Sequence, residues 1–85
     1  MKKSRYLNSD RTDTFLGMYK DYDLYAEIRD KRAVNISLYM GSHRYLWNGH
    51  TEDWTGHARI HWNLEEMNNA LASAKLRVTL MGITV

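Results

Sequence analysis

The sequence predicts an α+β fold: an antiparallel β-meander of about four to five strands with one helix packed on one face, in the order β-β-β-β-α-β. Three segments alternate apolar and polar residues, which is typical of strands that bury one face. One later segment repeats its apolar residues every three or four positions, as an amphipathic helix does. A chain of 85 residues is long enough for one domain and too short for two.

Two neighbouring segments, 22–29 and 33–40, show the clearest alternation. The charged residues 30–32 between them are predicted to form a three-residue turn, which places Arg29 opposite Ala33. Each segment then has one apolar face. The residues predicted to face the core are Tyr22, Leu24, Ala26 and Ile28 in the first segment and Val34, Ile36, Leu38 and Met40 in the second.

Gly41 and Ser42 predict a two-residue hairpin turn into a third strand over 43–48, because glycine suits the first central position of a type II′ turn. This register places Tyr39 opposite Arg44 on the face away from the core. On the core face it pairs Leu38 with Tyr45 and Ile36 with Trp47.

Asn63 is predicted to begin the helix. Its side chain suits the N-cap position, and Glu66 three residues later completes a capping box. A fourth strand is predicted before the helix, over 57–62, and a closing strand after it, over 76–85, where the apolar residues return to a period of two. The predicted buried stripe of the helix consists of Leu64, Met67, Leu71 and Ala74.

Residues 1–14 are polar and lack periodicity, so they are predicted to form a flexible basic arm before a single α+β domain over 15–85. The chain has no cysteine, which excludes disulfides, thiolate zinc sites and cysteine nucleophiles. No segment approaches the roughly 18 apolar residues of a membrane span, and no apolar signal region follows the basic start, so a cytoplasmic protein is expected. Because so small a domain has a thin core, a homodimer is also predicted.

The face of the meander away from the core is the first candidate site, with Tyr25, Arg29, Tyr39 and Arg44 on it. Single-stranded RNA binds to aromatic rings that stack on its bases and to cations that contact its phosphates. The formal net charge of +2 agrees with such a partner, although ordinary cross-strand pairing of Tyr39 with Arg44 is the alternative interpretation. The predicted phosphate contacts are Lys2, Lys3, Arg5, Lys31 and Arg32.

Two other functions are considered. Trp54 follows Glu52 and Asp53 in a predicted loop, where an exposed tryptophan could anchor a protein partner, so that the chain would act as a protein–protein inhibitor. His57 and His61 on one strand face would suit a metal-independent ribonuclease, but strand residues four apart lie about 13 Å from each other. The histidines lack companion ligands at zinc-binding spacing. Neither a metal nor a cofactor is therefore predicted.

The sequence as a whole is short, lacks cysteine and contains no recognisable motif. In this profile it is similar to accessory proteins of phages and mobile elements, which bind and inhibit a host factor. The resemblance implies a counter-defence or toxin-inhibiting role and assigns no individual residue. Taken together, the sequence predicts a small non-enzymatic RNA-binding regulatory protein.

Overall fold

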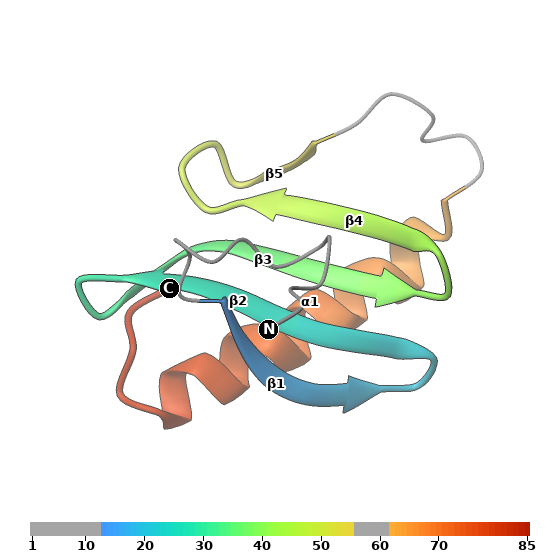
Figure 1. Ribbon diagram of the computed structural model, residues 1–85. Coiled ribbons are helices and arrows are strands. Elements are labelled where there is room, and N and C mark those ends of the chain that lie inside the picture. Colours follow the sequence, from blue (N-terminus) through green and yellow to red (C-terminus); the bar gives the residue numbers. More distant parts are fainter. Residues whose placement is uncertain (1–12, 56–61) are drawn as a thin grey trace, which may run out of the picture.

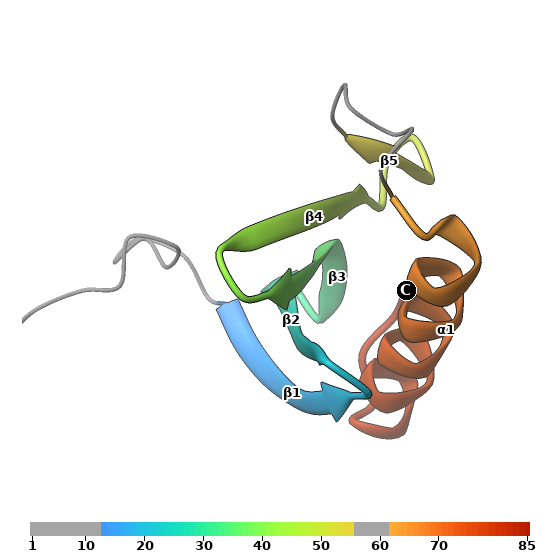
Figure 2. The same cartoon turned by 90° about the vertical axis from the view of Figure 1, so that its right-hand side faces the viewer.

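A computed structural model describes residues 13–55 and 62–85, and it confirms the α+β class. Five antiparallel strands follow one another across a single sheet in chain order, and α1 packs against one face of that sheet (Figures 1 and 2). The strands are β1 (Asp13–Tyr19), β2 (Tyr22–Arg29), β3 (Arg32–Met40), β4 (His43–Asn48) and β5 (Asp53–Thr55), and the helix α1 is Leu64–Leu80.

The core lies between α1 and the face of the sheet that contacts it. The alternation read from the sequence supplies the strand half of this core, with Leu24, Ile36 and Leu38 fully buried. The helix half comes from residues three or four apart, which lie on one side of an α-helix. These are Met67, Ala70, Leu71, Ala74 and Val78, whereas Leu64, predicted to be buried, is 38% exposed.

The turn between β2 and β3 has two residues and not the predicted three. Asp30 and Lys31 both adopt positive φ, at 53° and 62°, as the tight primed hairpin turns require. Ile28 therefore pairs with Ala33, and an extra residue in β3 shifts the register one step further along. Because of this bulge Ala33 is buried, while Val34, predicted to face the core, is only half-buried.

The sheet begins earlier than the sequence predicted. Residues from Asp13 onward form β1, so the boundary of the predicted arm at residue 14 falls inside a strand. β5 lies within a predicted loop and pairs with the end of β4, from Leu46 to Asn48. The fourth strand predicted over 57–62 falls almost entirely outside the described residues. The Gly41–Ser42 turn and the pairing of Tyr39 with Arg44 are confirmed.

The closing strand predicted over 76–85 is wrong, because α1 continues to Leu80. The apolar residues that alternate in this segment are Leu76, Val78 and Leu80. Of these three, Val78 is the buried one, and it continues the helical spacing of Ala74. Arg77 points back to the edge of the sheet, where its guanidinium donates hydrogen bonds to the carbonyl oxygens of Leu16 at 3.0 Å and Met18 at 2.8 Å. Burial of Val78 and the hydrogen bonds of Arg77 therefore both favour a helical conformation for residues 76–80.

The helix N-cap is confirmed. The Asn63 side chain accepts a hydrogen bond from the backbone N–H of Glu66 at 3.1 Å. Beyond α1, Thr84 forms a single parallel bridge with Arg32 at the start of β3. Among the described residues no helix is long and apolar enough to cross a membrane.

Leu71→Asp is expected to abolish cooperative unfolding. The new carboxylate would lie in the core between α1 and the sheet, where Leu71 is only 7% exposed. Burying an unpaired charge costs several kcal/mol, a large part of the total stability of a small domain. Leu76→Asp is the matched control, since Leu76 belongs to the same helix and is 60% exposed. Thermal unfolding followed by circular dichroism compares the two, and equal melting temperatures would contradict the assigned helix face.

Candidate functional site

The outer face of the sheet, which is the face away from α1, carries a row of three aromatic rings that ends in an arginine. Phe15 of β1 and Tyr25 of β2 have ring centroids 5.2 Å apart. Tyr25 lies at the same distance from Tyr39 of β3, with the rings nearly perpendicular. The guanidinium carbon of Arg44 on β4 is 5.8 Å from the centre of the Tyr39 ring. We call these four residues the aromatic row.

The members of the aromatic row differ in accessibility. Phe15 is 54% exposed and Arg44 is exposed, while Tyr25 is half-buried. Tyr39 is only 7% exposed, because it is packed between the Tyr25 ring and the Arg44 guanidinium. The sheet is curved, with β1 and β4 on either side of the central strands β2 and β3 (Figure 2). β1 and β4 therefore supply the accessible ends of the row.

The aromatic row could be predicted from the sequence only in part. Tyr25, Tyr39 and Arg44 were identified by strand alternation, and the structure brings them together. Phe15 was missed because Gly17 interrupts its segment, which therefore did not look like a strand. In the structure Gly17 adopts φ of 108° beside a bulge, and a β-carbon there would lie 2.5 Å from the Arg77 guanidinium. A glycine in an apolar segment was the available signal, since glycine often marks a bulge.

Arg29 lies on the outer face as predicted, but its charge is compensated. Its Nε donates a hydrogen bond to Glu27 at 2.8 Å, and the other carboxylate oxygen of Glu27 accepts one from Asn35 at 2.9 Å. Glu27 is only 6% exposed, so this pair is partly desolvated. Asp23, which lies opposite Tyr39, adds a second acidic group to this face. The outer face thus has mixed charge and is not a uniformly basic surface.

Lys31 and Arg32 are both exposed at the turn that joins β2 to β3. Arg44 lies at the other end of the sheet, because its partner Tyr39 pairs with Asp23 near the start of β2. Exposed cations therefore stand at both ends of the sheet.

Trp54 is buried and not exposed as predicted. It lies on β5 opposite Trp47, is 7% exposed, and its Nε1 donates a hydrogen bond to Asn68 of α1 at 3.0 Å. The loop after β4 is short enough to return the chain into the sheet, so Trp54 takes the inward phase. The remaining candidates, namely Lys2, Lys3, Arg5, His57 and His61, lie outside the described residues.

Two tyrosines have perturbed ionisation. Burial raises the pKa of Tyr22 from 10.0 to about 12, and Glu66 adds to this because its carboxylate repels the phenolate and accepts a hydrogen bond from the phenol at 3.4 Å. Burial likewise raises the pKa of Tyr39, although the charge of Arg44 opposes the shift. Tyr22 lies on the core side of β2 and Tyr39 on the outer face, so these shifts report burial at two separate places.

Within residues 13–55 and 62–85, no three histidine, aspartate or glutamate side chains cluster closely enough to hold a metal ion. Comparison with known proteins finds no matching family model, no matching curated protein and no matching solved structure.

Alkaline conditions are expected to destabilise the protein through Tyr22. An unfolded tyrosine loses its proton near pH 10, whereas the folded protein keeps Tyr22 protonated up to about pH 12. The folded state therefore binds more protons across this interval, and the free energy of unfolding falls as the pH rises through it. Urea denaturation at a series of pH values measures the fall. Tyr22→Phe should make the decline shallower, and an unchanged slope in this variant would contradict the assignment.

Proposed function

We propose that the protein binds single-stranded RNA on the outer face of its sheet and acts as a non-enzymatic regulatory factor. The observation that carries this proposal is the aromatic row, in which three ring systems in contact lead to an exposed guanidinium. Bases stack on aromatic side chains regardless of sequence, and each stacked base contributes about 1–3 kcal/mol. Arginine adjacent to a stacking surface contacts the phosphates between the bases.

The strand would enter at Phe15, the most exposed ring, and its bases would stack along Phe15 and the accessible part of Tyr25. Tyr39 packs edge to face against Tyr25 from the neighbouring strand. It is not itself the main stacking surface for bases, since it is largely buried. Arg44 is oriented by a 3.4 Å hydrogen bond to Ser37 and by its contact with the Tyr39 ring. Because Glu27 compensates Arg29, Lys31 is the phosphate contact at the far end, whereas the Arg32 side chain rises on the other side of β3.

A protein partner is the second candidate, and a specific observation favours it. Met18 on β1 is 57% exposed beside Asp23 on the outer face, close to the exposed Phe15. An apolar patch with an acidic neighbour suits a protein surface as well as a base. The version of this function anchored by Trp54 has lost its support, because that side chain lies in the core. The counter-defence role, the cytoplasmic location and the homodimer stay predictions.

Phe15→Ala and Arg44→Gln are each expected to weaken RNA binding by about tenfold, equivalent to about 1.4 kcal/mol. The first removes the accessible stacking ring and the second removes a phosphate contact. Lys20→Gln is the matched charge control, because Lys20 is an exposed cation whose ammonium pairs with Glu66 at 3.6 Å and belongs to no part of the row. Fluorescence anisotropy with labelled oligouridine at several salt concentrations measures the affinities.

Arg44→Gln should also give a shallower salt dependence, because one fewer counterion is released when RNA binds. Circular dichroism verifies that each variant folds. Absence of RNA affinity in the unmodified protein at low salt would reject the proposal in favour of a protein partner. Equal weakening by Lys20→Gln would show that only net charge matters and that the aromatic row is not the site.

A further inference from the structure

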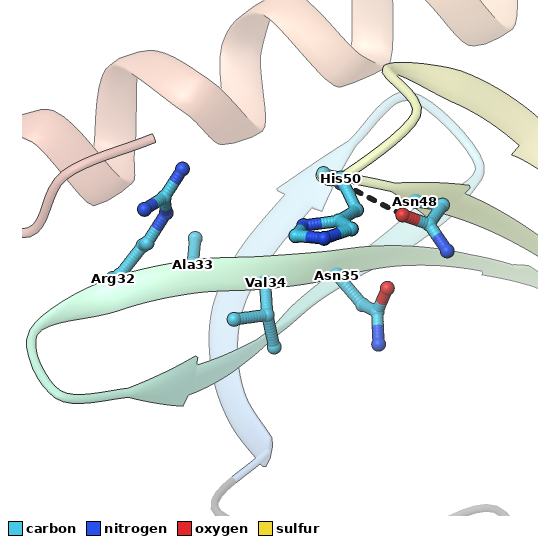
Figure 3. Close-up of a pocket in the computed structure, with 7 residues that line it drawn as sticks. Arg32, Ala33, Val34, Asn35, Asn48 and His50 are labelled. Carbon is cyan, nitrogen blue, oxygen red and sulfur yellow. Dashed lines mark hydrogen bonds between the residues drawn. The ribbon is translucent and has the colours of Figure 1, made fainter.

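A pocket of about 260 Å³ lies where the start of β3 meets the turn that follows β4 (Figure 3). It is separate from the aromatic row and is formed by four consecutive residues of the bulged part of β3, 32–35, and by residues 48–50 at the end of β4 and the turn after it. The volume lies just below the range of small-molecule sites, which begins near 300 Å³, so the pocket suits a group smaller than a drug-sized ligand.

The side chains of Arg32 and His50 flank this pocket on the same side of β3. Figure 3 shows Arg32 and His50 rising above the strand with the methyl group of Ala33 between them. Ala33 is 2% exposed and closes the floor. Val34 and Asn35 both point to the opposite side, which is the consequence of the bulge. The bulge thus leaves only a methyl group between the arginine and the histidine on this side of β3.

The backbone on both sides of Arg32 is held in place by the segment after α1. Thr84 accepts a hydrogen bond from the Ala33 N–H at 2.8 Å and donates one to the Lys31 carbonyl at 2.9 Å. Arg32 is therefore exposed on a fixed backbone although it lies next to a hairpin turn. A fixed backbone reduces the entropy lost when the side chain engages a ligand.

The turn that carries His50 is equally constrained. The side-chain oxygen of Asn48 accepts hydrogen bonds from the backbone N–H groups of His50 at 2.7 Å and Thr51 at 3.1 Å. Gly49 donates its N–H to the Val34 carbonyl at 2.8 Å. A β-carbon at Gly49 would lie 2.8 Å from that same carbonyl oxygen, so only glycine lets the turn approach β3 this closely.

Among the described residues that line the pocket there is no carboxylate, whereas there are a guanidinium and an imidazole. A guanidinium presents paired donors that match two oxygens of a phosphate, and an imidazole N–H donates to a third. Donors carried on a fixed backbone, without an acidic neighbour among the described lining residues, suit an oxyanion. We propose that this pocket binds a terminal phosphate group, with Arg32 and His50 as its ligands. Inorganic phosphate, a free nucleotide and the 5′-phosphate of an RNA strand all supply this group.

The test is a backbone-amide chemical-shift titration with inorganic phosphate, uridine 5′-monophosphate, uridine and acetate as probes. The two phosphates are expected to bind, with shifts at residues 32–35 and 48–50, whereas uridine and acetate should not. Arg32→Gln and His50→Gln should each weaken uridine 5′-monophosphate binding by about tenfold. Lys20→Gln is the matched control, since Lys20 is an exposed cation that neither lines the pocket nor belongs to the aromatic row. It should change the affinity by less than about twofold.

Three results would overturn the proposal: no shift with either phosphate, acetate binding as tight as phosphate binding, or equal losses in Lys20→Gln and Arg32→Gln. Two further arms identify the source of the phosphate. If a 5′-phosphorylated oligouridine binds more tightly than its unphosphorylated form, and Arg32→Gln removes the difference, the pocket receives the end of an RNA strand. If the 5′-phosphate adds nothing while the mononucleotide binds, the pocket serves a free nucleotide. Binding of the mononucleotide should be unaffected by Phe15→Ala, so failure of the aromatic row and failure of the pocket are separable.

Discussion

Burial of one face of the sheet beneath a single helix is the constraint on which the rest of this structure depends. The two alanines of α1 at the interface, Ala70 and Ala74, are fully buried and let the helix approach the strands closely. A small domain with one helix can cover only one face of its sheet, and Leu24, Ile36 and Leu38 of β2 and β3 lie on that side. Everything proposed for binding therefore falls on surfaces that the helix does not cover.

Irregular backbone, and not regular structure, determines where the binding features are placed. The bulge in β1 lets the chain pass Gly17 close to Arg77, whose guanidinium satisfies two outward carbonyl groups of this edge strand. An edge strand with unpaired backbone groups is prone to pair with other chains, and a charge placed there opposes such pairing. The bulge in β3 changes which side chains face α1 at the start of that strand. Both bulges lie next to residues to which the two proposals assign ligand contacts.

The fold could be predicted where a buried face leaves only one register, and not elsewhere. In the middle of β2, β3 and β4 a slip of one residue would turn every core side chain to solvent, so alternation was sufficient to pair Tyr39 with Arg44. Alternation over only a few residues is ambiguous, and Leu76 to Leu80 are helical because Arg77 and Val78 both find partners that way. The orientations of the Val34 and Trp54 side chains were predicted wrongly. Each depends on the length of the adjacent turn or loop, which sets the register of the strand that follows. The compensation of Arg29 by Glu27 depends on side-chain geometry that periodicity does not encode.

The order of the elements along the chain has a consequence for biosynthesis. All five strands precede α1 and pair only with their neighbours in sequence, so the hairpins can form as the chain leaves the ribosome. Until α1 has been synthesised, the apolar side of the growing sheet has no cover, and the Thr84 bridge that fixes the start of β3 is also missing. Nascent chains would therefore expose an incomplete sheet with an uncovered apolar face, which is prone to aggregation, until α1 has been made. The interval is brief, because only residues 56–63 separate β5 from α1.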